Sequence, residues 1–139
     1  MSRSIASLSI LGIVLLCAIA GADRAESAAK PERPAAESFL LHCSGCHRAD
    51  GSGIPGFAPD LRAIGALLDT QAGRRYLGRV PGVAQAPLDD AALAALLNWV
   101  LIEIADRRPE PLYGADEIGA LRAAPLRDPI AARRALAIR

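Results

Sequence analysis

The pentapeptide CSGCH at residues 43–47 constrains the fold of this 139-residue chain more than any other feature. The chain has three cysteines and two histidines, and this segment gathers Cys43, Cys46 and His47 within five positions. On a helix, this spacing puts the two thiols about one turn apart, with the imidazole directly after the second. We therefore expect one bound group to organise this part of the chain.

The C-x-x-C-H pattern is a signature of covalent haem attachment. Cys43 and Cys46 would form thioether bonds to the vinyl groups, and His47 would be the metal ligand on the proximal side. A structural disulfide would leave His47 unexplained, and a thioredoxin-like pair needs a βαβ context that the sequence lacks. The donors of a zinc site, His42 included, would all come from six residues, too close together to surround a tetrahedron. The predicted cofactor is one haem c.

Apolar periodicity predicts an all-α fold. Apolar residues recur at helical spacing in residues 36–43 and 61–68, and Asp69 or Thr70 can cap a further helix that runs to Leu77. The strongest stripe, in a helix capped by Asp89 or Asp90, consists of Leu93, Leu96, Leu97, Val100 and Ile104. Two weaker helical patterns follow, and irregular loops are predicted where Gly and Pro cluster. The weaker patterns span residues 116–123 and 130–136, and the loops span residues 51–59 and 81–87.

The N-terminal segment is interpreted as a targeting sequence. An apolar run of 16 residues follows Arg3 and closes on small residues, which predicts a cleaved signal peptide at residues 1–20. A membrane-spanning helix needs about 20 residues, so we expect no stable span after cleavage. Residues 21–34 carry two prolines and no apolar period and are expected to form a flexible leader. These features predict a bacterial periplasmic protein.

Charge excludes one class of partner and divides the chain. Sixteen basic against 15 acidic residues provide no strong positive field for nucleic acid. Residues 37–106 hold five Arg and eight acidic residues, whereas residues 107–139 hold seven Arg and four. We interpret residues 35–106 as the haem domain and residues 107–139 as a C-terminal helical extension. That extension is expected to be a solvated appendage rather than an electrostatic clamp on the haem domain.

The haem domain resembles a class I c-type cytochrome. A helix that runs into CSGCH, a Gly-rich turn, a Pro-x-Leu element and a closing helix with an aromatic residue occur in that family's order. The resemblance implies that the Pro59 carbonyl accepts a hydrogen bond from the His47 ring. It also implies that Leu61 packs on the haem edge, and that Phe39 and Trp99 lie where the terminal helices cross.

One feature of the family is missing from this sequence. Family members commonly supply a sixth iron ligand from a Met followed by Pro in the loop before the last helix. Here Val80 precedes Pro81, and the single methionine is Met1. We therefore predict a five-coordinate or weakly ligated haem. Other candidate donors are His42, Gln85, Tyr76 and Lys30.

These features together predict an exported monohaem electron carrier that is not an enzyme. The resemblance implies redox protein partners, such as a periplasmic dehydrogenase and a terminal electron acceptor. The alternative is a five-coordinate haem protein that binds a diatomic gas or peroxide, with Arg79 as the candidate cation for peroxide chemistry. A third interpretation is a subunit of a larger dehydrogenase.

Overall fold

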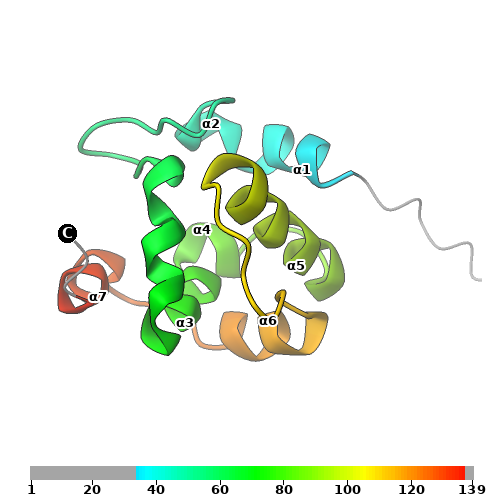
Figure 1. The fold of residues 1–139 in the computed structure, drawn as a ribbon, viewed down its shortest axis with the longest axis vertical. Helices are drawn as coiled ribbons and strands as arrows, with labels where there is room; N and C mark the ends of the chain where they lie inside the picture. Colours follow the sequence, from blue (N-terminus) through cyan, green and yellow to red (C-terminus); the bar gives the residue numbers. More distant parts are fainter. Residues whose placement is uncertain (1–33, 137–139) are drawn as a thin grey trace, which may run out of the picture. The chain divides into compact units, whose positions relative to one another are not determined.

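The computed structural model describes residues 34–136, and this part of the chain is built from helices (Figure 1). Within these residues, the only β pairing is an isolated bridge between Ile54 and Ala58. The predicted all-α class is therefore confirmed. The predicted signal at residues 1–20 and nearly all of the leader lie outside the described residues. No helix in residues 34–136 combines the length and the apolar character needed to cross a bilayer.

Most of the helices follow one another through short connections, and the two longer connections lie between α2 and η1 and between η2 and α6. In chain order they are α1 (Ala35–His42), α2 (Ser44–His47), the 3-10 helix η1 (Leu61–Asp69), α3 (Gln71–Arg79), α4 (Pro81–Ala84), α5 (Asp90–Trp99), the π-helical turn η2 (Val100–Ile104), α6 (Ala115–Arg122) and α7 (Pro129–Ala135). The prediction of an irregular loop at residues 81–87 is wrong at its start. Pro81 suits a first helical position, and the Ala84 N–H donates to the Val80 carbonyl at 2.9 Å, which closes the single turn of α4.

Side chains that accept a backbone N–H fix where the helices begin. The Thr70 hydroxyl accepts from Gly73 at 3.0 Å, as the sequence predicted for α3. Asp89, one of the two predicted candidates, caps α5 by accepting from Ala92 at 2.8 Å. Asp90 is therefore free for another contact, which it makes with the C-terminal part of the chain.

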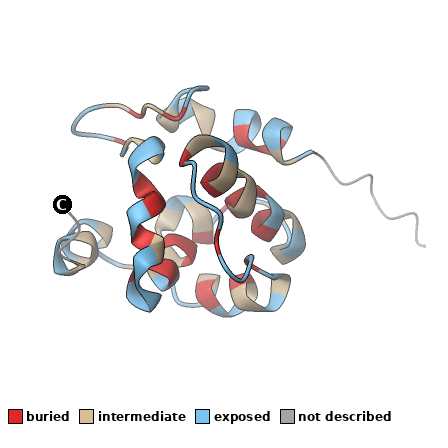
Figure 2. Ribbon diagram, viewed as in Figure 1, coloured by how far each residue is buried: buried red, intermediate tan, exposed pale blue. Residues whose placement is uncertain are grey.

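The core forms where η1, α3, α5 and α6 face one another (Figure 2). The predicted stripe on α5 and η2 lies in this core, with only Ile104 partly exposed. α1 packs on α5, and the rings of Phe39 and Trp99 meet there with centroids 5.5 Å apart. Terminal helices of the predicted haem domain therefore cross at the expected aromatic pair.

The described part of the predicted extension, residues 107–136, is called the C-terminal segment below. The part of it up to residue 122 contributes side chains to the core, because Tyr113, Ile118 and Leu121 are buried. The Tyr113 hydroxyl donates to the Arg74 carbonyl at 2.8 Å. The expectation of a solvated appendage is wrong for α6, whereas α7 has no buried residue. By their contacts, residues 34–136 belong to one compact unit.

Ion pairs join the C-terminal segment to the rest of the fold. The Arg74 guanidinium binds both oxygens of Glu117 at 2.7 Å; Arg74 is almost fully buried, and Glu117 is partly exposed. The Glu117 carboxylate raises the pKa of Arg74. In two further pairs, Arg122–Asp90 and Arg107–Asp69, the C-terminal segment contributes the arginine and the rest of the fold the aspartate. The opposite net charges of residues 37–106 and 107–139 thus reflect ion pairs between the two parts and not a detached appendage.

Two isoleucines of the C-terminal segment test its place in the core. Ile118 is 0% exposed and Ile130 is 65% exposed. We expect Ile118→Ala to lower the free energy of unfolding by about 2–5 kcal/mol, because it opens a cavity in the core. The matched Ile130→Ala should change it by less than about 0.5 kcal/mol. Urea denaturation of both variants measures the difference, and equal losses would show that α6 is not part of the core.

Candidate functional site

The predicted ligand residues lie where α1 runs into α2. Cys43 occupies the junction, and its N–H donates to the Phe39 carbonyl at 2.9 Å, which ends α1. The His47 N–H donates to the Cys43 carbonyl at 2.9 Å and closes the turn of α2. Cys46 is exposed, whereas Cys43 is partly buried against the core. The chain thus holds both sulfurs and the imidazole on one helical turn, as the spacing predicted.

Both thiols of this turn are free, so they do not form the structural disulfide considered above. Burial, and to a smaller extent the nearby Cys46, raises the pKa of the Cys43 thiol. Cys43 is therefore held protonated, unlike the low-pKa thiolate of a thioredoxin-like pair. Among residues 34–136, no three His, Cys, Asp or Glu side chains lie together as a metal-binding group.

The His47 ring has a fixed orientation. Its Nδ1 lies 2.9 Å from the Pro59 carbonyl oxygen, twelve residues along the chain. A carbonyl can only accept, so this contact requires the proton on Nδ1 and leaves the lone pair of Nε2 for a metal ion. The hydrogen bond that the cytochrome resemblance implied is thus present in the structure. A partner of this kind both orients a ligating imidazole and makes it a stronger donor.

The glycine-rich loop at residues 51–59 brings the Pro59 carbonyl back to His47. The Gly53 N–H donates to the His47 carbonyl at 3.0 Å, and Ile54 and Ala58 exchange two backbone hydrogen bonds of 2.9 Å. Gly53 has a φ of +70°, and a Cβ built on it would lie 2.5 Å from the Pro59 oxygen. Only glycine therefore fits between the His47 turn and the carbonyl that orients its ring.

Leu61 lies at the exit of the same loop. Its N–H donates to the Gly51 carbonyl at 2.8 Å, and its side chain packs partly against the core. Asp60 caps η1 and pairs with Arg62, which lowers the pKa of the Asp60 carboxyl. Hydrogen bonds on both sides thus hold the chain around Pro59. This loop connects the CSGCH turn with Pro59 and Leu61, the other two residues predicted for cofactor binding, and Pro59 is the one hydrogen-bonded to the His47 ring.

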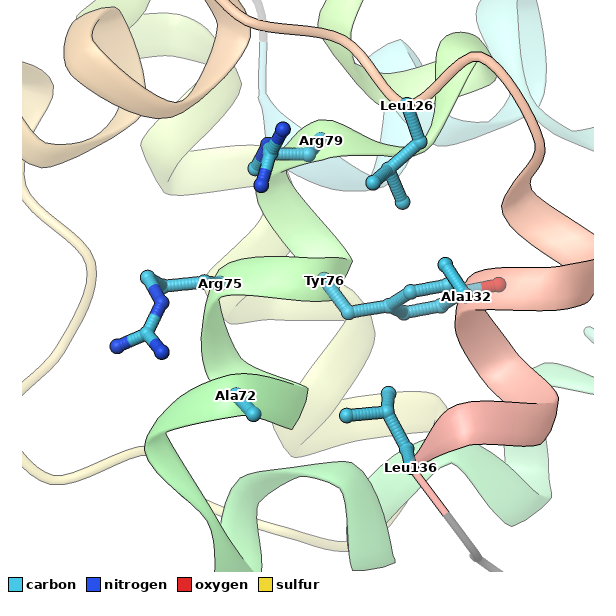
Figure 3. Close-up of a pocket in the computed structure, with 7 residues that line it drawn as sticks. All are labelled: Ala72, Arg75, Tyr76, Arg79, Leu126, Ala132 and Leu136. Atoms are coloured by element: carbon cyan, nitrogen blue, oxygen red, sulfur yellow. The ribbon is translucent and has the colours of Figure 1, made fainter.

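The candidate sixth ligands are placed in different ways. Val80 begins α4 and is partly buried, while Gln85 is exposed at the end of that turn. His42 is exposed at the end of α1. Tyr76 extends from α3 toward α7, where burial raises its pKa (Figure 3). Lys30 lies outside the described residues.

A pocket of about 190 Å³ separates α3 from α7 (Figure 3). Its lining residues are Ala72, Arg75, Tyr76, Arg79, Leu126, Ala132 and Leu136. Arg79 donates from Nε to the Ala124 carbonyl at 2.6 Å, and its own carbonyl accepts from Leu126 at 2.8 Å. Arg79 and Tyr76 therefore contact the C-terminal segment, which weakens the assignment of Arg79 as a cation for peroxide chemistry.

Sequence reasoning missed Gly53 and Arg122. The Gly and Pro content of residues 51–59 indicated a loop, but only the folded backbone reveals which glycine touches the Pro59 carbonyl. Arg122 binds three backbone carbonyls of the segment before α5. No sequence pattern indicates such partners, because every residue carries a carbonyl.

Gly53 and Gly56 form a matched pair for testing the His47–Pro59 contact. Both have positive φ, +70° and +77°, so alanine strains either backbone by about 1–3 kcal/mol. Only Gly53→Ala also pushes on the Pro59 carbonyl, since nothing lies within 4 Å of a Cβ at Gly56. We expect Gly53→Ala to be the more destabilising, by about 1 kcal/mol or more in urea. NMR should show faster exchange of the His47 Nδ1 proton in this variant alone, and equal behaviour would contradict the crowding.

Comparison with known proteins adds no family assignment to this geometry. No family model matches the chain, and no curated protein matches it either. Two features of the chain's own residues indicate its function: two free thiols on one helical turn, and an imidazole whose ring is oriented by the Pro59 carbonyl.

Proposed function

We propose that this chain is an exported monohaem c-type cytochrome that transfers electrons. Cys43 and Cys46 would hold haem c through thioether bonds, and His47 would be its proximal ligand. When bound, the haem iron supplies a one-electron Fe(III)/Fe(II) couple. The observation that carries the proposal is the 2.9 Å contact between His47 Nδ1 and the Pro59 carbonyl, beside two free thiols.

The chain's own residues have distinct roles in this proposal. The free thiols of Cys43 and Cys46 suit covalent attachment, because neither is consumed in a disulfide. His47 offers Nε2 to the iron, since Nδ1 is engaged with Pro59. Leu61, exiting the same loop, would pack on the haem edge. Val80 cannot ligate iron, so we propose a five-coordinate or weakly ligated centre.

The proposed setting is the periplasm, after removal of a signal peptide at residues 1–20. Partners would be redox proteins, such as a periplasmic dehydrogenase and a terminal acceptor. The second candidate function, binding of a diatomic gas or peroxide, follows from Val80 at the expected Met position. For peroxide turnover the contact of Arg79 with Ala124 is unfavourable, because a catalytic cation must reach the substrate.

Covalent haem is tested by substitutions within the CSGCH turn. Expressed in a host that matures c-type cytochromes, the wild type should keep its haem on a denaturing gel. The Cys43→Ser/Cys46→Ser double variant should lose it, because both thioether bonds are gone. Ser44→Ala is the control, since Ser44 bonds only the Leu40 carbonyl, at 2.6 Å. A wild-type protein of apoprotein mass, measured by mass spectrometry, would refute the proposal.

Coordination and electron transfer are tested on the purified holoprotein. Resonance Raman and EPR spectra should show a five-coordinate or weakly ligated iron that binds CO tightly. A low-spin six-coordinate signal in both oxidation states would contradict the open site. In stopped-flow mixing with candidate periplasmic partners, the reduced protein should transfer electrons faster than an unrelated carrier does. Peroxide turnover without such transfer would favour the second candidate function.

A further inference from the structure

Arg122, at the end of α6, binds the chain between α4 and α5. Its Nε donates to the Ala84 carbonyl at 3.1 Å, and its Nη2 donates to the Ala86 carbonyl at 2.6 Å. Its Nη1 donates to the Leu88 carbonyl at 2.7 Å and to Asp90 Oδ1 at 3.1 Å. One guanidinium thus donates to the carbonyls of every second residue from Ala84 to Leu88 and to a carboxylate. This needs the several N–H donors that arginine holds in a fixed planar arrangement.

These hydrogen bonds are partly shielded from water. The Arg122 side chain is 20% exposed, and Ala84 and Ala86 are buried. Hydrogen bonds from a charged donor are stronger than neutral ones, and a buried carbonyl that loses its partner is costly. Arg122 therefore makes a large contribution to holding this stretch of backbone in one conformation.

The C-terminal segment also holds the beginning of the same region. The Leu126 N–H donates to the Arg79 carbonyl, and Arg79 Nε donates to the Ala124 carbonyl. Leu121 packs so closely on α3 that a Cβ on Gly78 would lie 2.6 Å from its Cδ1. The residues from Val80 to Leu88, which include α4 and are called the 80–88 loop below, are thus held from both ends by residues 121–126.

The 80–88 loop is the stretch in which a sixth iron ligand was expected. It has Val80 before Pro81, so no iron–sulfur bond can tie this loop to a haem. Gln85 is its only side chain with a donor atom for iron, and the carbonyls on either side of Gln85, those of Ala84 and Ala86, are bonded to Arg122. Arg122 thereby fixes the backbone on both sides of Gln85, whose side chain is exposed.

We propose that Arg122 is a positioning residue that holds the 80–88 loop in place of an iron–ligand bond and thereby limits access of small ligands to the sixth position of the iron. This inference rests on the proposed function, because it needs haem on His47. It gives the C-terminal segment a role: the segment would hold the loop that the cytochrome resemblance places at the sixth position of the iron. Loosening the loop admits external ligands more often, as the opening of a lid does.

The test compares Arg122→Lys with Arg107→Lys in the holoprotein. Both substitutions keep the charge of an arginine of the C-terminal segment that pairs with an aspartate outside it, but Arg107 pairs with Asp69 and has no hydrogen bond to the 80–88 loop. Lysine at position 122 can still face Asp90, which preserves the fold, yet a single ammonium cannot reach all three carbonyls. The first readout is hydrogen exchange of the Ala86 and Leu88 amides, and the second is the CO association rate.

We expect Arg122→Lys to speed exchange of these two amides about tenfold, as the loss of charged hydrogen bonds implies, and to raise the CO association rate several-fold. Arg107→Lys should leave both unchanged. Exchange equal to that of the Arg107 variant would overturn the holding role, and faster exchange with unchanged CO association would overturn the control of access. Absence of covalent haem in the wild type would instead refute the proposed function, while the exchange readout would still report on the loop.

Discussion

The hydrogen bond between the His47 ring and the Pro59 carbonyl is the interaction on which the candidate site depends. It joins the turn that carries both thiols to the far end of a glycine-rich loop. Gly53 makes the approach possible because a side chain there would occupy the space of the Pro59 oxygen. The imidazole can serve as a metal ligand with a defined tautomer only when this loop is closed. The chemistry of three residues thus depends on the backbone of nine others.

Local patterns in the sequence predicted the parts of the fold that depend on local forces. The apolar stripe ending at Ile104 predicted the helix α5 and its buried face, because helical period and burial are coupled. Thr70 and Asp89 marked helix starts, since their side chains satisfy backbone groups within three residues. The CSGCH spacing predicted the arrangement of thiols and imidazole for the same reason. The hydrogen bond between His47 and Pro59 joins residues twelve positions apart. It was predicted from the resemblance to a family and not from a local pattern.

The position of the C-terminal segment could not be read from the sequence. Counting charges suggested two blocks of opposite sign, but the pairs that matter, such as Arg74 with Glu117, join residues 43 positions apart. The sequence does not indicate that Ile118 is buried, because the apolar pattern of so short a helix is the same whether the helix lies in solvent or in a core. The partners of Arg122 are mostly backbone carbonyls, which are the same in every residue. The position of the C-terminal segment is therefore determined by tertiary contacts, which neither apolar periodicity nor charge counts predict.

Arg122 binds backbone carbonyls and not side chains in the 80–88 loop, and this affects which substitutions the loop can accept. The contacts that Arg122 makes with Ala84, Ala86 and Leu88 depend on backbone geometry alone. Substitutions of these three residues that keep the backbone conformation and its burial leave the hydrogen bonds from Arg122 intact. Gln85, whose side chain is exposed, can therefore be exchanged without loss of these three hydrogen bonds, so the side chain that the loop presents and the stability of its backbone can change independently.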